Sequence, residues 1–393
     1  MEQKSKIKIV VSLFVLMALV IVFSSISMRV WGEKPEKIPL RQELVFQEEM
    51  TLAEFGKTNQ LPSTVLKEVF GLVSKEDLQK KMTEFNLSRD QVLTRVNKSL
   101  AIEGEHASKN WSKILIKFVF WFLFLGFVFF LVRKRKITSG NRRWVLLSGV
   151  VLFGIILGSD PSPMGTIKDA IVLFAKSGVI FPPRMIALTL FLILVFVANK
   201  FICTWGCQFG TLQDFIFRLN RDSKDRKGVV KQFKPPFVIS NTIRVVFLAA
   251  FTLVAFFWKV DFVEFIDPFK TFNPGKIIIV GALFIGAVLI ASLFIYRPWC
   301  HFFCPFGLAG WIVEKVSLFK IKVNYETCIA CEACAKACPS TVMNAILKRE
   351  RVIPDCFSCA TCIETCPTCS INFESGKRNK PPKGKFQQQK NKF

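Results

Sequence analysis

Eight cysteines near the carboxyl end repeat one spacing twice. The chain reads CIACEACAKACP over Cys328–Pro339 and CFSCATCIETCP over Cys356–Pro367, two copies of C-x2-C-x2-C-x3-C-P. Three closely spaced thiolates can hold one face of a [4Fe–4S] cube, while the fourth, placed before proline, reaches the other cube. The spacing therefore predicts two clusters with crosswise ligands. The predicted ligands are Cys328, Cys331, Cys334 and Cys366 for cluster 1, and Cys338, Cys356, Cys359 and Cys362 for cluster 2.

Zinc is the main alternative for such thiolate-rich loops. A structural zinc site also takes four thiolates, but it seldom takes three from one short loop, twice, each time followed by Cys-Pro. The spacing therefore favours iron over zinc. Cys369 is a further thiol in the same segment. Because the eight ligand positions are already filled, we interpret Cys369 as a small residue without a ligand role.

The remaining four cysteines form a second repeat. CTWGCQFG, Cys203–Gly210, and CHFFCPFG, Cys300–Gly307, both read C-x3-C-x-F-G and each follows an apolar run. If a helix continues through C-x3-C, its two thiols lie on one face, about 5–6 Å apart at Cβ. Two such pairs, related by an axis along the membrane normal, could hold a third iron–sulfur centre or copper, since soft thiolates favour both.

The alternative for this second repeat is four buried small residues at helix ends. We favour a redox or metal site, because the cysteines recur in register while their neighbours differ. The residues of this site would be Cys203, Cys207, Cys300 and Cys304. His301 adjoins this motif, and we interpret it as a solvated or hydrogen-bonded imidazole at a helix end. The only other histidine is His106, so a haem held between two histidines in the bundle is not expected.

Apolar runs must position these cysteines. The chain is 51% hydrophobic, with 42 Phe against 2 Tyr, which points away from an ordinary soluble enzyme. Six runs approach the length of about 20 residues that crosses a bilayer. They are Ile9–Met28, Ile114–Val132, Trp144–Gly158, Met185–Ile202, Val245–Trp258 and Ile277–Tyr296. A signal peptide usually has an apolar core of about 7–15 residues, so an uncleaved anchor is favoured for the first run.

The basic residues predict the orientation of the chain. The net charge is +25, which suits basic loops that stay in the cytoplasm better than it suits nucleic-acid binding. Lys4, Lys6 and Lys8 precede the first run and Arg133–Lys136 follows the second. With six spans, both termini are therefore predicted in the cytoplasm. Membrane lipid is an expected partner and nucleic acid is not.

The predicted fold is a membrane all-α helical bundle of about six transmembrane helices with a carboxyl-terminal α+β, bacterial-type 2[4Fe–4S] ferredoxin domain. Within the second domain, Pro62 predicts a turn between short helices and Gly71 a helix stop. The predicted domains are an amino-terminal transmembrane anchor (1–28), a small extracytoplasmic helical domain (29–113), a five-helix membrane domain with both CxxxC repeats (114–320), the ferredoxin domain (321–374) and a basic flexible tail (375–393).

At these motifs the chain resembles the membrane-bound 4Fe–4S polyferredoxins of the NapH, NosR and CcoG type. The resemblance covers roughly residues 140–370, where Cys300, Cys304 and Pro305 match the family pattern and Gln208 stands where the family often has proline. It implies an electron-transfer subunit of the bacterial inner membrane rather than a stand-alone enzyme. Such a subunit would relay electrons between the quinone pool, or a cytoplasmic donor, and a respiratory reductase partner.

The resemblance leaves two other functions open. One is a copper- or metal-reducing assembly factor that uses the CxxxC pairs, and the other is a redox-sensing regulatory or scaffold protein. NosR-like members carry a covalently attached flavin outside the membrane, and residues 29–113 hold no such attachment sequence. We therefore expect no covalent flavin. The expected partners are quinone or quinol and other redox subunits.

Overall fold

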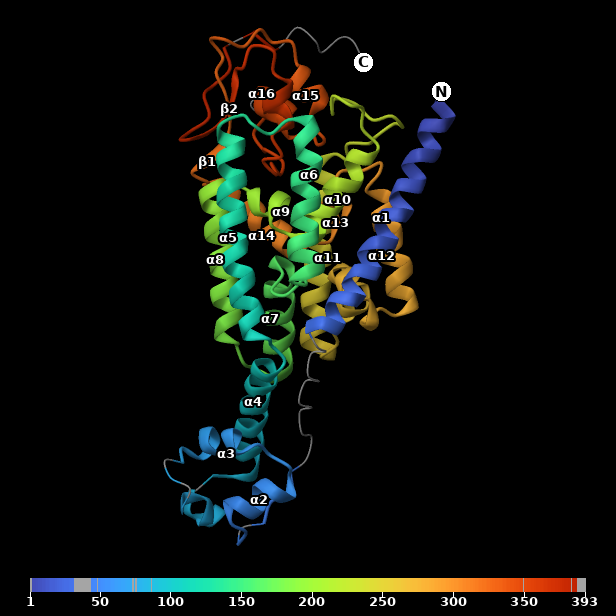
Figure 1. Cartoon of the computed structure of the whole chain (residues 1–393). Coiled ribbons are helices and arrows are strands. Elements are labelled where there is room, and N and C mark those ends of the chain that lie inside the picture. The colour runs from blue at the N-terminus through green and yellow to red at the C-terminus, as the bar shows by residue number, and fades with distance from the viewer. Residues whose placement is uncertain are drawn as a thin grey trace.

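The computed structural model describes residues 2–31, 44–47, 49–72, 74, 76–85, 87–348, 350–382 and 384–386. A long helical bundle carries the cysteine-rich domain at one end and a small helical module at the other (Figure 1). We call these the ferredoxin end and the far end. The amino end of the first helix lies at the ferredoxin end (Figure 1).

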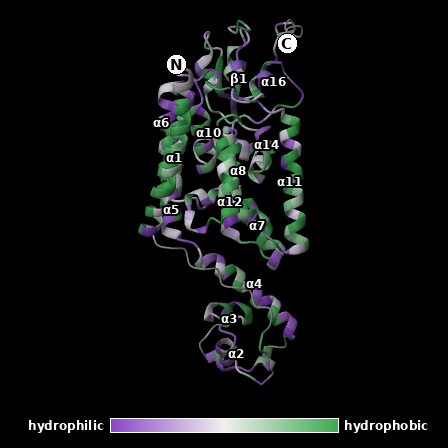
Figure 2. Ribbon diagram, turned by 90° about the vertical axis from the view of Figure 1, so that its right-hand side faces the viewer, coloured by the Kyte–Doolittle hydropathy of each residue, from purple (hydrophilic) through white to green (hydrophobic). Residues whose placement is uncertain are grey.

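The bundle is made of apolar helices that run between the two ends. They are α1 (Glu2–Trp31), α5 (Trp111–Arg133), α6 (Ser139–Val150) with its π-helical continuation η3 (Val151–Ile156), α7 (Pro163–Ser177), α8 (Pro182–Ala198), α11 (Phe237–Trp258) and α12 (Ile279–Ala291). Figure 2 shows apolar residues along these helices and more polar ones at both ends. Large apolar side chains such as Leu123 and Phe257 are exposed on the bundle surface, which suits contact with lipid.

Six transmembrane helices are not confirmed. Among the described residues, α1, α5 and α11 are long and apolar enough to cross a membrane, while α8 and α12 are apolar but shorter. The predicted run Met185–Ile202 joins two helices, because α8 ends at Ala198 and the chain then turns into a short helix. The run Ile277–Tyr296 likewise extends past the end of α12 at Ala291.

The far-end module packs around its own apolar core. It contains α2 (Leu52–Thr58), α3 (Ser63–Phe70), η1 (Glu76–Gln79), η2 (Met82–Phe85) and α4 (Arg89–Ala107). Pro62 precedes α3 and Gly71 ends it with a left-handed residue, so the predicted turn and stop are confirmed. Glu105 of α4 pairs with Arg184 of α8 at 2.7 Å, which joins the module to the bundle. Residues 32–43 of the predicted domain 29–113 lie outside the described residues.

Two short helix pairs lie inside the bundle, each after a bundle helix. α9 (Phe201–Trp205) and α10 (Gln208–Leu219) follow α8, and α13 (Pro298–Phe302) and α14 (Pro305–Glu314) follow α12. Between α11 and α12, the segments η4 (Phe262–Ile266), η5 (Pro268–Phe272) and η6 (Pro274–Lys276) form the far-end connection. The two halves of the bundle therefore share the order of long helix, connection, long helix and short helix pair.

The ferredoxin domain combines a two-stranded sheet with short helices, as predicted. Strands β1 (Phe319–Val323) and β2 (Ile371–Ser375) pair antiparallel, with Ile321 opposite Phe373. Between them lie α15 (Ala333–Ala337), α16 (Val342–Lys348) and α17 (Thr361–Thr365). Arg135, just after α5, donates hydrogen bonds to the Cys369 and Ile371 carbonyls at 2.7 and 2.6 Å. These bonds hold the domain on the end of the bundle.

Part of the predicted basic tail contacts the ferredoxin domain. Arg378 donates to the Ile321 carbonyl at 3.0 Å, and Lys385 donates to the Tyr325 carbonyl at 2.6 Å. Residues 383 and 387–393 lie outside the described residues. The described tail therefore packs along β1 and the loop that follows it.

Candidate metal centres

Both cysteine loops of the ferredoxin domain have the same backbone shape. Ala330 and Glu332 in the first loop, and Ser358 and Ala360 in the second, all have positive φ, between 51° and 63°. They occupy the same positions of the two copies. A non-glycine residue in this region costs of order 1–3 kcal/mol, and such strain concentrates at ligand-binding sites. These positive φ values turn the backbone of each loop so that the loop surrounds a concave centre.

Each loop encloses a small cavity that is lined by four cysteines. One cavity is lined by Cys328, Cys331, Cys334 and Cys366, and the other by Cys338, Cys356, Cys359 and Cys362. These are the two sets that the spacing predicts. The crosswise step arises because α15 and α17 pack together and end one residue before Cys338 and Cys366. Each of these two cysteines thereby reaches the cavity of the other loop.

The two cavities differ in depth. Cys331 is exposed, whereas Cys338, Cys356 and Cys362 are buried. Burial raises the pKa of Cys334 and of Cys356 to about 12, so these thiols keep their protons at neutral pH unless a metal replaces them. Binding of iron by the thiolates would therefore release protons.

The spacing of the thiols distinguishes a cluster from a single ion. Within the described residues, no set of three or more His, Cys, Asp or Glu side chains is spaced to hold one metal ion. The four sulfurs of a tetrahedral zinc site would lie about 3.8 Å apart, given a Zn–S bond of about 2.3 Å. In a four-iron cube each thiolate binds a different iron, which spreads the sulfurs further. The donor set therefore fits a cluster better than zinc.

The CxxxC pairs do not lie on continuous helices, although the sequence analysis considered a helix that continues through each C-x3-C motif. α9 ends at Trp205, and Cys207 is extended (φ −80°, ψ 116°) at the start of α10. Cys304 has almost the same conformation (φ −74°, ψ 116°) at the start of α14. Pro305 favours a helix start after Cys304, and Gln208 at the equivalent position gives the same turn. The two pairs are therefore built alike.

The four CxxxC thiols come together inside the bundle. Cys203, Cys300 and Cys304 are buried and Cys207 is nearly so. Contacts across the repeat bring the two pairs within reach of each other, since Arg297, three residues before Cys300, donates to the Cys203 carbonyl. The Sγ of Cys304 accepts a hydrogen bond from the Gly307 amide at 3.4 Å.

Two buried cations hold the pairs together across the repeat. Lys200 precedes Cys203 by three residues, and Arg297 precedes Cys300 by three. Lys200 donates to the Gly307 carbonyl of the other half at 2.6 Å, and Arg297 donates to the Cys203 carbonyl. Each cation therefore binds the backbone of the opposite half.

Asp355 links the CxxxC pairs to the second ferredoxin loop. This fully buried carboxylate precedes Cys356 and pairs with Lys200, and with Arg244 at 3.1 Å. His301 lies 3.8 Å from Asp355 and is 5% exposed. His301 is therefore not solvated, because Phe357 of the ferredoxin domain packs against its ring; the other alternative, a hydrogen-bonded imidazole, stays a prediction.

Buried cations outnumber carboxylates in this region. Among the described residues, six cations pair with four carboxylates. The cations are Arg142, Lys200, Arg218, Arg221, Arg244 and Arg297, and the carboxylates are Asp214, Asp225, Asp355 and Glu364. Burial raises the pKa of Glu314 to about 8, so it adds little negative charge at neutral pH. An uncompensated buried charge is costly. The surplus fits an anionic occupant such as a thiolate-bound cluster.

The sequence analysis missed the cations and Asp355. Lys200 and Arg297 occupy equivalent positions of the two CxxxC copies, so alignment of the copies could have found them. Arg244 lies directly before a predicted span, and its role depends on a tertiary contact with the Cys300 carbonyl at 3.3 Å. No local pattern indicates that contact.

Family models match both cysteine regions. Residues 320–367 match a 4Fe-4S dicluster domain, and residues 180–226 and 277–324 each match a 4Fe-4S binding domain. Together with the three long apolar helices, these matches define a membrane protein with ferredoxin-type 4Fe–4S domains. The resemblance to the membrane-bound 4Fe–4S polyferredoxins is confirmed.

The chain is similar to several curated proteins. It is 29% identical over 167 residues to YccM of Escherichia coli, whose name assigns it to electron transport, and 29% identical over 147 residues to the regulatory protein NosR of Pseudomonas aeruginosa. These matches cover 40% and 35% of this chain, but only 46% of YccM and 19% of NosR. The uncharacterized protein MJ0749 of Methanocaldococcus jannaschii is 25% identical over 58% of this chain and 82% of its own length. No solved structure matches the chain.

Proposed function

We propose that the protein is an electron-transfer subunit of the bacterial inner membrane with three iron–sulfur centres. Two [4Fe–4S] clusters would be held by the cysteine sets of the ferredoxin domain, and the third centre by the four CxxxC cysteines. When bound, each centre accepts and donates single electrons. The ferredoxin domain and both termini would face the cytoplasm, since basic residues flank the helices at that end. The subunit would serve the quinone pool and a partner reductase.

One observation carries this proposal. Each ferredoxin-domain cavity is lined by four cysteines drawn from both loops, which is the ligand exchange that two interlocked cubes require. The chain's own groups then have clear tasks. The cysteines hold the centres, the buried cations balance their negative charge, and the apolar shell excludes water. Lys200 and Arg244 meet at Asp355, which joins the third site to the second loop.

Iron analysis of anaerobically purified protein tests the proposal. Three four-iron centres give about twelve irons per chain. We expect about eight when all four CxxxC cysteines are replaced by serine, while Cys369→Ser should retain all twelve. A value of eight in the wild type, unchanged in the quadruple variant, would overturn the third iron–sulfur centre. Stoichiometric copper that the quadruple variant loses would instead support the metal-handling alternative, and a colourless zinc protein would overturn the whole proposal.

A regulatory role is the second candidate. NosR is named a regulatory protein, and the far-end module could dock a partner. The two functions differ in how a bound centre is used. A carrier should reduce an added one-electron acceptor repeatedly, whereas a sensor should change its binding to a partner when its centres are reduced. To distinguish them, protein that has been reduced with dithionite and freed of the excess is mixed with cytochrome c. A carrier should pass its stored electrons on, and a second round of reduction and mixing should give the same yield.

A further inference from the structure

An apolar cavity of about 450 Å³ lies at the far end between α5 and α8. Aromatic rings of Phe118, Phe122 and Phe181 contribute to its wall. Leu115 and Ile186 also line it and are 69% and 68% exposed on the bundle surface. The cavity therefore opens toward the region that lipid occupies. A flat, apolar molecule dissolved in the membrane could enter without crossing water.

Part of the wall of this cavity is polar. Ser162 at the start of α7 and Asp169 in its middle line it together with Arg184 from α8. Asp169 lies 3.3 Å from Arg184 and 3.3 Å from Lys168. A cavity with apolar walls and a few fixed polar groups is typical of sites that bind and orient small molecules.

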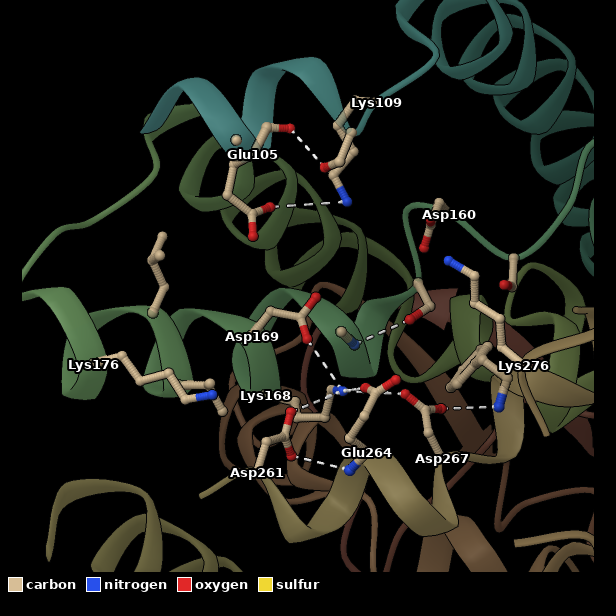
Figure 3. A pocket seen from close by; sticks show the side chains of 18 of the residues that line it. Glu105, Lys109, Asp160, Lys168, Asp169, Lys176, Asp261, Glu264, Asp267 and Lys276 are labelled. Carbon is tan, nitrogen blue, oxygen red and sulfur yellow. Dashed lines mark hydrogen bonds and ion pairs between the residues drawn. The ribbon is translucent and has the colours of Figure 1, made fainter. Parts of the chain in front are cut away.

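A second, polar cavity of about 610 Å³ adjoins the first. Figure 3 shows side chains that line this polar cavity. Both cavities are lined by Lys109, Asp160, Ser162, Gly165 and Asp169. In the polar cavity, the amine of Lys168 lies 3.3 Å from Asp261, 2.6 Å from Glu264 and 3.3 Å from Asp267 (Figure 3). The apolar cavity therefore continues into a row of carboxylates at the far end.

One of these carboxylates titrates near neutral pH. Burial raises the pKa of Asp267 to about 6, against the opposing effect of Lys168, while Asp169 and Glu264 raise it further. A carboxyl group with a pKa near the ambient pH can both accept and release a proton. The row of carboxylates can therefore carry protons away from the apolar cavity.

On the opposite side, the apolar cavity leads to the CxxxC pairs. A small cavity that shares Phe118 and Pro161 with it is lined by Trp121, Gly206 and Gln208. The ring centres of Phe118 and Trp121 lie 6.2 Å apart. Trp121 Nε1 donates to the Gly206 carbonyl at 3.0 Å, and Gly206 adjoins Cys207.

The position of Trp121 shows how deep the CxxxC pairs lie. Trp121 is ten residues from the start of α5 and twelve from its end. At 1.5 Å per residue, the contact with Gly206 is about 15 Å from the far end of α5 and about 18 Å from the other end. This contact therefore lies about halfway along α5.

We propose that the apolar cavity binds a lipid-soluble hydroquinone, with its ring at Ser162 and Asp169 and its tail between α5 and α8, and that the hydroquinone is oxidised there. Oxidation to the quinone breaks two O–H bonds and releases two protons and two electrons. The protons pass to Asp169 and the carboxylates around Lys168. The electrons would pass one at a time to the iron–sulfur centre that Cys203, Cys207, Cys300 and Cys304 would hold, so this inference rests on the proposed function.

The structure favours a hydroquinone over a phospholipid as the occupant. The cavity is lined by Asp160 and Asp169 together with Lys109 and Arg184, so its polar wall has no surplus of positive charge for a phosphate, whereas a phenolic O–H can donate to a carboxylate. The polar cavity provides a route for protons and the aromatic contacts lead to the cysteines. A phospholipid needs neither route.

Filling the cavity tests the inference in the full chain. Ala187 lines the cavity and is buried, so Ala187→Phe should occupy the space of the ring. Ile193→Phe changes an exposed position of the same helix that does not line the cavity, and it serves as the control. The protein is placed in nanodiscs, and binding of radiolabelled decylubiquinol is measured beside the bleaching of the iron–sulfur absorbance that this hydroquinone causes.

We expect saturable binding and bleaching in the wild type and in the control. Ala187→Phe should weaken binding by about tenfold or more, while dithionite still bleaches its absorbance fully. Equal binding in Ala187→Phe and wild type would overturn the inference, as would a tightly bound phospholipid that decylubiquinol does not displace. If the wild type shows no iron–sulfur absorbance that dithionite bleaches, the proposed function fails. If that absorbance is present and decylubiquinol neither binds nor bleaches it, only the cavity assignment fails.

Discussion

Replacing Cys338 with serine tests the crosswise ligand arrangement most directly. Cys338 belongs to the first loop by sequence, yet it lines the cavity of Cys356, Cys359 and Cys362. Its loss should remove a ligand from the second centre and leave the first centre intact. One four-iron centre is lost, so the iron content should fall from about twelve to about eight per chain. Cys369→Ser, an exposed thiol that lines neither cavity, should keep the full content.

Two double variants show which centre each cysteine serves. In the crosswise arrangement, Cys338→Ser with Cys331→Ser damages both ferredoxin centres and leaves about four irons, whereas Cys338→Ser with Cys359→Ser damages only one and leaves about eight. If each loop instead held its own cube, the two results would be exchanged. Iron and sulfide analysis under argon measures the contents, and electron paramagnetic resonance after dithionite reduction identifies the centres that remain.

The exchanged result would refute the reasoning from the cavity linings. Reciprocal variants at Cys366 guard against an effect peculiar to one helix. Cys366→Ser with Cys359→Ser should leave about four irons, and Cys366→Ser with Cys331→Ser about eight. Circular dichroism of each variant shows whether the bundle is still folded, so that a general loss of structure is not mistaken for the loss of a ligand.

Three further predictions concern the cavities and the repeat. In Gly307→Ala the added Cβ would lie 2.7 Å from the Cys300 carbonyl oxygen, so we expect a loss of about 1–3 kcal/mol in thermal unfolding, whereas Gly286→Ala meets nothing within 4 Å and should not be destabilised. Lys168→Met removes the cation shared by Asp169, Asp261, Glu264 and Asp267 and should cost about 3–5 kcal/mol at pH 7, with a smaller loss at pH 5, where Asp267 is protonated. Because burial raises the pKa of Asp267 to about 6, its stabilising contribution is full below about pH 4 and is lost as the pH rises through 6. The stability of Asp267→Asn relative to wild type should therefore increase over that interval, and unchanged relative stability in chemical denaturation would contradict it.

The ferredoxin domain was the most predictable part of the chain. Its cysteines lie in short loops with fixed spacing, so local geometry decides which thiols meet. The structure brings the two predicted sets together, and the positive φ values at Ala330 and Ser358 show how the loops close. The turn at Pro62 was predictable for the same reason, since proline restricts its own backbone.

The interior of the bundle could not be predicted in the same way. The helix break at Cys207 depends on tertiary contacts, because Arg297 from the other half binds the Cys203 carbonyl. Gly210 makes room for this contact, since a Cβ there would lie 3.4 Å from the Arg297 guanidinium. Periodicity reads one segment at a time and cannot detect a cation that arrives from a distant segment.

The bounds of the apolar runs were imprecise for a related reason, and six spans stay a prediction. Hydropathy merges α8 with α9, because both are apolar and only two residues, Asn199 and Lys200, separate them. The amphipathic helix α7 was missed because Lys168 and Asp169 interrupt its apolar residues. Lys168 and Asp169 line the polar cavity. The residues that break the apolar pattern of α7 are therefore the ones that form this cavity.

The exchange of Lys200 and Arg297 between the halves has an evolutionary consequence. Each half supplies the cation that the other half needs, so one half alone could not complete the central site. A shorter ancestral gene encoding a single half would have required two identical subunits, paired about a twofold axis, to build it. Fusion of the duplicated genes would then have freed the halves to diverge, leaving lysine in one and arginine in the other.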